Sequence, residues 1–147
     1  MANPLIPLGV LNRLRGSVVW PSFPSLNVTA PYLGKEGIRL ALEGETTAYL
    51  PQMTGAVTSP EPYQMISLRI VLLKTQGLAA LYKAQMETSA LLGDGTVRPD
   101  ASSLPPFEIT NCAIESVAEL AFNGESADFA VNIRGYYLTN SSLWDLA

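Results

Sequence analysis

Hydrophobic and polar residues alternate most regularly over residues 109–138, and this alternation predicts a long amphipathic β-hairpin. The turn is expected at Asn123-Gly124, because both residue types tolerate the positive φ angles of a tight hairpin turn. One face is mainly apolar in both strands. It carries Cys112, Ile114, Ser116, Ala118, Leu120 and Phe122, then Ala127, Phe129, Val131, Ile133 and Gly135. A two-residue and a four-residue loop place these residues on the same face, so the prediction does not depend on loop length.

The opposite face of this predicted hairpin is small, polar and acidic. It carries Glu115, Glu119 and Asp128 against a single arginine, Arg134, with Asn132 among them. With a two-residue loop Glu119 lies directly across from Asp128, and like charges in a cross-strand pair cost up to roughly 1 kcal/mol. Two interpretations fit this face: an ordinary solvated side of a sheet, or a surface selected to be anionic and non-adhesive, such as the wall of a channel.

Further strands are predicted in the middle of the chain. Residues 37–50 are expected to form a hairpin that turns at Gly44-Glu45, and residues 52–62 are expected to form a loop. Residues 63–74 form the strongest predicted strand, and both of its faces are largely apolar. This pattern is typical of a strand that is buried on both sides.

One helix is predicted, over residues 76–92, with Thr75 as its N-cap and Gly93 just beyond its end. Residues 93–106 are expected to form a loop, because they contain Asp94-Gly95 and three prolines. Since one helix cannot build a helical core, it must cover a sheet. The fold class expected is therefore mainly β: an antiparallel β-sandwich or open barrel with one flanking α-helix.

The two ends of the chain differ from its middle. Residues 1–31 are rich in proline and predict an extended arm with one short strand at Ser17–Trp20. The tail, residues 139–147, contains Trp144, which we expect to dock on protein rather than remain in water. With 147 residues and no internal repeat, the chain is expected to form a single domain over residues 1–147.

Charge is scarce in this sequence: 15% of residues are charged, against a usual share of roughly 25%. A domain of this size needs more charge to cover its outside, so we expect much of the surface to be covered by other protein subunits. No apolar run reaches about 18 residues, so we expect no membrane-spanning segment, and the N-terminus shows no secretory signal. The net charge is −4 and the basic residues are scattered, which disfavours specific nucleic-acid binding.

The side chains that carry most enzyme chemistry are missing. The sequence has no histidine and a single cysteine, Cys112, which the hairpin pattern places on the apolar face. A zinc site and a Ser-His-Asp or Cys-His arrangement are therefore excluded, and no phosphate-binding glycine motif is present. Glu115 and Glu119 lack the aromatic cluster that would accompany a glycosidase pair. We expect no catalytic residues, no cofactor and no metal, and the protein is not expected to be an enzyme.

The order of the predicted elements suggests a family. A proline-rich arm and a hairpin are followed by the long strand YQMISLRIVLLKT, the helix QGLAALYKAQMETSALLG, and the closing hairpin FEITNCAIESVAELAFNGESADFAVNIRGYYL. Over roughly residues 17–138 this order resembles bacteriophage tail tube proteins of contractile tails. The resemblance depends on element order, element length and the character of the last hairpin, and no short invariant motif carries it.

The resemblance implies a homohexameric ring whose long hairpins join into a β-barrel shared between subunits, and rings that stack into a hollow tube. The tube would conduct DNA during ejection without binding it specifically, and the tape-measure protein would occupy its lumen. The resemblance further implies contacts with the tail sheath protein and with baseplate and tail-terminator proteins, assembly in the host cytoplasm, and a final location in the virion tail. Lumen-facing candidates are Glu115, Glu119, Asp128 and Asn132. The arm and the 52–62 loop are expected to contact neighbouring subunits.

Two alternatives remain at this point. One, of the same class, is a type VI secretion ring protein or a tube-initiating protein at the baseplate. The other, of a different class, is a β-sandwich module that binds a small ligand or a peptide, which requires a concave apolar pocket.

Overall fold

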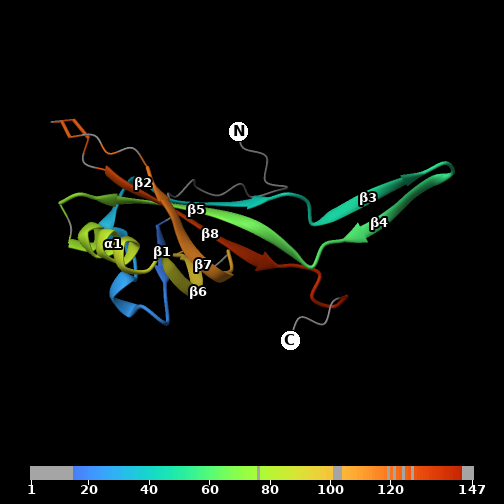
Figure 1. The fold of residues 1–147 in the computed structure, drawn as a ribbon, viewed down its shortest axis with the longest axis horizontal. Coiled ribbons are helices and arrows are strands. Elements are labelled where there is room, and N and C mark those ends of the chain that lie inside the picture. Colours follow the sequence, from blue (N-terminus) through green and yellow to red (C-terminus); the bar gives the residue numbers. More distant parts are fainter. Residues whose placement is uncertain are drawn as a thin grey trace, which may run out of the picture.

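A curled sheet, one helix and a projecting hairpin make up the computed structural model (Figure 1). The structure describes residues 15–75, 77–100, 104–118, 120, 122–123, 125–126 and 128–143. Six antiparallel strands in the order β1-β6-β7-β8-β5-β2 form a half-barrel, and β3 pairs with β4 in a separate two-stranded sheet. The expected mainly β fold with one helix is therefore confirmed for the described part of the chain.

The elements have the following bounds. The strands are β1 (Gly16–Val19), β2 (Leu33–Glu43), β3 (Thr47–Gln52), β4 (Gly55–Pro60), β5 (Tyr63–Leu73), β6 (Leu91–Pro99), β7 (Phe107–Val117) and β8 (Asp128–Leu138). The helix α1 spans Gly77–Thr88, and two short 3-10 helices, η1 and η2, span Pro24–Leu26 and Ala30–Tyr32.

Strand β5 lies near the middle of the sheet and pairs with β8 along its whole length, from Tyr63↔Leu138 to Leu73↔Asp128. Its other side pairs with β2. One face of β5 is completely buried; it consists of Ile66, Leu68, Ile70 and Leu72. The strand prediction is confirmed, but burial on both sides is wrong. On the second face Val71 is buried, whereas Met65 and Arg69 are exposed, because no layer of the described chain covers that side of the sheet there.

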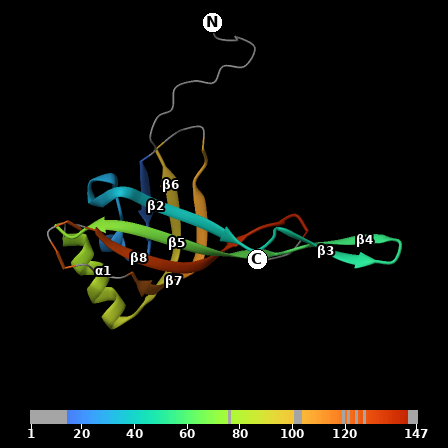
Figure 2. The same cartoon turned by 90° about the horizontal axis from the view of Figure 1, so that it is seen from above.

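The hydrophobic core fills the inside of the half-barrel. Val18 on one edge strand belongs to the same buried cluster as Ile70 on β5, which requires the sheet to curl around a common interior. The edges also approach each other: a Cβ added to Gly16 of β1 would lie 3.4 Å from Cδ1 of Ile38 of β2. Figure 2 shows α1 beside one end of this curled sheet.

Trp20 is the largest completely buried side chain and connects the sheet to the helix. Its Nε1 donates to the hydroxyl of Tyr82 at 2.9 Å, and that hydroxyl donates to the backbone oxygen of Leu26 at 2.7 Å. The Trp20 ring lies directly over Gly95 of β6, where any Cβ would overlap ring carbons. A glycine inside this strand therefore marks close packing of a ring on the backbone.

The predicted hairpin over residues 37–50 is wrong in its pairing. Its first strand, β2, pairs with β5, whereas its second, β3, pairs with β4 inside the predicted 52–62 loop. Gly44 does have the positive φ of a turn, +82°, but the chain leaves the half-barrel there instead of returning along β2. Core contacts of β2 with β5 outweigh the local preference for a hairpin.

The predicted helix is also too long. It ends at Thr88, and β6 begins at Leu91 within the predicted helical range. Leu92 is completely buried as a strand residue, and Gly93, whose φ is +77°, lies in an irregular part of the β6–β7 pairing rather than after a helix. The 93–106 loop prediction is therefore wrong over residues 93–99. When the apolar pattern of a helix continues directly into that of a strand, the sequence pattern alone predicts one continuous helix.

The C-terminal hairpin is confirmed as the pair β7–β8, but its details differ. The strands stop at Val117 and resume at Asp128. The tight turn expected at Asn123-Gly124 includes Gly124, which lies outside the described residues, so that turn stays a prediction. The register shifts twice along β7, and Asn111 has a φ of +52°. As a result Val117 packs against the core and Ser116 is exposed, the reverse of the predicted alternation.

The connection between β7 and β8 exposes two residues that the pattern assigned to the apolar face. Leu120 is 37% exposed and Phe122 is 90% exposed. The Phe122 ring lies under the ammonium group of Lys74, 5.7 Å from the ring centroid, which gives it a cation–π contact at the surface.

The described part of the N-terminal arm confirms the short strand predicted at Ser17–Trp20, which is β1. Residues 1–14, and Trp144 with the rest of residues 144–147, lie outside the described residues, so the docking of Trp144 stays a prediction. Among the helices that the structure describes, none is long and apolar enough to cross a membrane.

Candidate functional site

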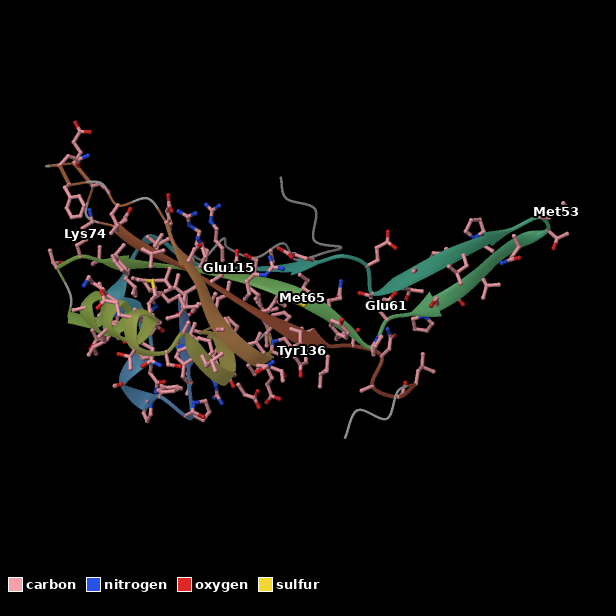
Figure 3. All side chains as sticks on the ribbon, viewed as in Figure 1. Met53, Glu61, Met65, Lys74, Glu115 and Tyr136 are labelled. Atoms are coloured by element: carbon pink, nitrogen blue, oxygen red, sulfur yellow. The ribbon has the colours of Figure 1, made fainter. Side chains whose placement is uncertain are left out.

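The face of the sheet opposite the core is the first candidate surface, and we call it the outer sheet face. It is formed by β2, β5, β8 and β7, whose paired residues line up in rows across the strands. The rows are Arg39–Arg69–Asn132–Ser116, then Ala41–Ser67–Arg134–Ala113, then Glu43–Met65–Tyr136–Thr110. Figure 3 shows Met65, Glu115 and Tyr136 on this part of the molecule.

Arg134 is the centre of an ion-pair network on the outer sheet face. Its Nη2 lies 2.9 Å from Oε2 of Glu43, and its Nε lies 3.2 Å from Oε2 of Glu115. Beside it the amide of Asn132 donates to the hydroxyl of Ser116 at 3.1 Å. These polar groups satisfy one another, which leaves this part of the face with few unpaired donors.

Asp128 and Asn132, two of the four predicted lumen residues, share the outer sheet face, as the alternation predicted. Glu115 lies at a register shift of β7 and reaches this face through its ion pair with Arg134. Glu119 lies outside the described residues, so its predicted pairing with Asp128 is outside them too. The side chain of Glu115 is 53% exposed even while it is paired with Arg134. Asp128 is at the far end of β8, where one of its carboxylate oxygens lies 2.7 Å from the Cβ position of Gly34.

Sequence analysis missed two arginines on the outer sheet face. Arg39 and Arg69 face each other directly across β2 and β5, and both are exposed. Neither forms an ion pair with another described residue. With Arg134 they balance the described acids Glu43, Glu115 and Asp128. The sequence of the C-terminal hairpin by itself shows an excess of acidic residues. The arginines that balance this excess are on β2 and β5, and a local pattern does not show that these strands lie beside β8.

The second candidate surface is the β3–β4 hairpin, which projects away from the half-barrel (Figures 1 and 3). Every residue from 49 to 58 is exposed, and residues 46–60 contain no charged side chain. Its exposed large apolar side chains are Tyr49 (65%), Leu50 (52%), Met53 (102%) and Val57 (52%). An isolated two-stranded hairpin is marginally stable in water, so this one depends on contacts at its base.

The base of the hairpin is held firmly by the body. The Thr46 hydroxyl donates to Oε1 of Gln64 at 3.1 Å, and Nε2 of the same buried glutamine donates to the backbone oxygen of Gly44 at 3.2 Å. The amide of Asn140 donates to the backbone oxygens of Thr46, at 3.0 Å, and Glu61, at 2.7 Å. These bonds fix the direction in which the hairpin leaves the sheet.

The third candidate surface is a groove of about 420 Å³, which lies between β2 and the neighbouring parts of β1, β6 and β7. Its apolar lining includes Leu33, Ile38, Leu40, Leu42, Val97 and Phe107. The charged residues that line it are Arg15, Glu36 and Arg98. Arg15 is paired with Asp100 at 2.8 Å, and this bond holds the pKa of the exposed Asp100 carboxyl below its usual value.

Cys112 is buried, as predicted, with its sulfur 2.6 Å from where a Cβ on Gly135 would be. Burial, and secondarily the negative charge of Asp94, raises the pKa of its thiol to about 12. The thiol is therefore protonated at neutral pH and is a poor nucleophile. Among the described residues no group of three or more His, Cys, Asp or Glu side chains could hold a metal ion.

No protein-family model matches this sequence, and no curated protein matches it. The outer sheet face, the projecting hairpin and the groove are therefore the evidence on which a function can be proposed.

Proposed function

We propose that this protein is a structural subunit of a phage tail tube, in which six copies form a ring and rings stack into a hollow tube that conducts DNA. The observation that carries the proposal is the uncharged hairpin β3–β4, exposed over residues 49–58, on a body that already has its own core. Exposed apolar elements of this size mark interaction surfaces. A subunit surrounded by copies of itself would cover the hairpin.

The edge of the sheet supports assembly as well. Strand β2 is at the end of the sheet order, and no strand pairs with its second side within the described residues. Free strand edges pair readily with other chains. In the proposed ring, the edge of β2 joins the sheet of a neighbouring copy and extends the half-barrels into a shared inner β-barrel.

The outer sheet face is the proposed wall of the bore, with Glu115, Glu119, Asp128 and Asn132 among its residues. Three features support this orientation: the face is polar, Arg134 is engaged by two carboxylates, and the chain carries a net charge of −4. DNA binds proteins mainly through unneutralised Lys and Arg, so a wall whose Arg134 is neutralised by Glu43 and Glu115, in a ring of net negative charge, would let DNA slide. Arg39 and Arg69 are exceptions on this wall and supply two local cations.

The remaining assignments follow from the proposal. The tube would contain the tape-measure protein before ejection, contact the sheath of a contractile tail on its outside, and end at baseplate and tail-terminator proteins. It would be assembled in the host cytoplasm and located in the virion. It has no catalytic role in this proposal.

Electron microscopy of the purified full-length protein in negative stain tests the proposal. Six-membered rings and tubes are expected, and sedimentation should show assembly that increases with protein concentration. A protein that remains monomeric at every concentration tested contradicts the proposal. Rings that never stack would instead favour a secretion-system ring or a tube-initiating protein.

The orientation of the wall needs a separate test in particles. Replacing Glu115 and Asp128 together by lysine should slow DNA ejection from tails of normal appearance, because two added cations per subunit bind phosphates in the bore. The matched control compares Glu87→Lys on α1 with Glu115→Lys alone, because the two single changes alter the net charge equally and Glu87 lies off the sheet. Equal effects of these two changes would place the outer sheet face away from the DNA path.

A second candidate function is favoured by the groove. Its volume of about 420 Å³ and its lining with Leu40, Val97 and Phe107 suit a module that binds a small apolar ligand or a peptide. In that case the purified protein would be a compact monomer, and an apolar fluorescent probe would bind it with a defined stoichiometry. Leu104→Asp, at the groove, should then abolish probe binding without changing the oligomeric state.

A further inference from the structure

Two arginines lie directly across from each other on the outer sheet face. Arg39 of β2 pairs with Arg69 of β5, and both side chains are exposed. The Cβ atoms of a cross-strand pair are about 4.5–5.5 Å apart, and like charges at that separation destabilise a sheet. Neither arginine forms an ion pair with another described residue. The fold therefore holds two guanidinium groups side by side without a counter-charge from the described chain.

The nearest row of charges on this face satisfies itself. Arg134 lies one row away from the two arginines and is bound by both Glu43 and Glu115. That network has two carboxylates and one guanidinium, so it keeps one negative charge in excess, but neither carboxylate turns to the arginine pair. Charge on the outer sheet face is therefore balanced in sum and separated in space.

The other two acids in this region do not neutralise the pair either. Glu36, three residues before Arg39, lines the groove and forms no ion pair within the described chain. Asp128 is opposite Leu73, four residues beyond Arg69 on β5. Four strand residues span roughly 13 Å, which exceeds the Debye length of about 10 Å in 0.1 M salt. An external anion therefore meets two cations that are not already neutralised.

Small side chains leave the pair open to solvent. Ala41 and Ser67 form the next row on the same face, beside the two arginines. Neither Arg39 nor Arg69 lines the groove beside β2. Small ligands are usually held in concave pockets. An open position such as this one instead suits an anionic group that a long chain carries across the sheet.

We propose that the Arg39–Arg69 pair binds a backbone phosphate of the DNA in the bore. The inference rests on the proposed function for the choice of DNA as the ligand, and it adds a defined contact to a wall that otherwise lets DNA slide. Each guanidinium is a planar fork of N–H donors that matches two phosphate oxygens. A phosphate between the two groups offsets their mutual repulsion, so an arrangement that destabilises the free chain becomes favourable on binding.

The contact is independent of base sequence, because phosphates carry no sequence information. In the proposed ring each copy contributes one pair, and the symmetry places all pairs at one level of the bore. DNA would then meet a row of cations in each ring, with neutral and acidic groups between the rows. Contacts of this kind depend steeply on salt, and they slow the passage of DNA without fixing its register.

Binding of short double-stranded DNA tests the pair in the full-length protein, at a concentration at which sedimentation shows monomers. Arg39→Gln/Arg69→Gln removes both cations. The control Arg15→Gln/Lys83→Gln removes two exposed cations that lie away from the outer sheet face. At low salt the first variant should bind DNA about tenfold more weakly than the wild type, and the control should bind normally.

The salt dependence of the same binding reports the phosphate contact itself. The slope of log K against log salt concentration should become shallower by roughly 1 in Arg39→Gln/Arg69→Gln and stay unchanged in the control. DNAs of different base composition should give the same values. A variant that keeps the affinity and the slope of the wild type overturns the inference, and so does a strong preference for one base sequence.

Two competitors, each at matched ionic strength, identify the ligand. DNA should bind the wild type more tightly than inorganic phosphate or poly-glutamate does. If inorganic phosphate displaces DNA completely, the site takes a free ion and the inference is wrong. If poly-glutamate binds more tightly than DNA and loses this binding in Arg39→Gln/Arg69→Gln, the ligand is a protein carboxylate and the inference is wrong as well.

Thermal unfolding separates a binding role from a structural one. Because the double replacement removes a cross-strand repulsion, Arg39→Gln/Arg69→Gln without DNA should unfold at the same temperature as the wild type or higher. DNA should raise the unfolding temperature of the wild type and not that of the variant, since a ligand of the native state stabilises it. A variant that unfolds at a clearly lower temperature would show that the arginines serve the sheet, which contradicts the inference.

Failure of the inference can be distinguished from failure of the proposed function. If the wild type forms rings and tubes but its DNA binding does not depend on the pair, the inference is wrong and the tube proposal stands. If the wild type never assembles but binds DNA through the pair, the tube proposal is wrong and the phosphate contact stands.

Discussion

Strand β5 and the β3–β4 hairpin follow each other in the chain, and both are antiparallel, but they use their apolar residues in opposite ways. Leu68 of β5 has no exposed surface, whereas Leu50 of β3 is 52% exposed. The first belongs to a core that one chain completes, and the second belongs to a surface that one chain leaves open. The comparison shows that apolar content alone does not distinguish a core strand from an exposed one; the neighbours of a strand decide whether its side chains are buried.

The largest difference between the two regions is expected for a matched pair of truncations. Leu68→Ala should lower the free energy of unfolding by about 2–5 kcal/mol, because it leaves a cavity in the core. Leu50→Ala should change it by less than about 0.5 kcal/mol in the monomer. Urea unfolding at a concentration that keeps the protein monomeric measures both. Equal losses would show that the hairpin belongs to the core of its own chain.

Glycines offer a second matched pair. Gly95→Ala should cost about 1–3 kcal/mol, because a methyl group at this position collides with the Trp20 ring. Gly55→Ala in the hairpin meets nothing within 4 Å and should be close to neutral. Thermal unfolding followed by Trp fluorescence compares the two. A neutral Gly95→Ala would mean that the Trp20 ring shifts freely and is not fixed in the core.

Two tyrosines compare a buried hydrogen-bond network with an exposed hydroxyl. Tyr82→Phe leaves the Trp20 Nε1 donor and the Leu26 carbonyl without their partner, which should cost about 1–3 kcal/mol. Tyr49→Phe, in the hairpin, should leave the unfolding free energy unchanged within error. Urea unfolding again provides the measurement. A loss at Tyr49 as large as at Tyr82 would be evidence against the solvent exposure of the hairpin.

The smallest effects are expected on the outer sheet face, which is neither core nor hairpin. Arg134→Ala removes ion pairs with Glu43 and Glu115 and should cost about 0.2–1 kcal/mol, less at high salt. Arg69→Gln relieves the repulsion from Arg39 across the strand pair and should stabilise by a few tenths of a kcal/mol. The free energy of unfolding measured at low and at high salt separates the loss expected for Arg134→Ala from the gain expected for Arg69→Gln. Changes of the same sign would contradict the pairing assigned to this face.

Several features of the fold were predictable because their causes are local. The alternation in residues 63–74 indicated β5, and the alternation in residues 109–138 indicated the pair β7–β8. The helix was visible through its period, but its end was not, because Leu91 and Leu92 continue an apolar pattern that the fold uses for a strand. The placement of Asp128 and Asn132 on one face followed from the period of two, whereas Glu115 lies where the register of β7 shifts.

The functional surfaces were only partly predictable. The absence of charge from residues 46–60 is visible in the sequence. The local pattern, however, divides these residues between a predicted hairpin over residues 37–50 and a predicted loop over residues 52–62. Nothing local shows that β2 and β3 separate after Gly44, so neither the projecting hairpin nor the groove beside β2 could be inferred. The balance of charge on the outer sheet face was hidden for the same reason, since Arg39 and Arg69 join it through pairing across the sheet.

The amino-acid sequence alone determined the class of the protein: a low-charge, mainly β chain with one helix, no histidine and a buried cysteine. These properties depend on composition and on the short periods of strands and helices. Only the tertiary structure decided which strands pair, and therefore which residues share a face and which apolar side chains stay outside. The reason is physical: pairing between distant strands depends on burying the core as a whole, and no short window of sequence contains that energy.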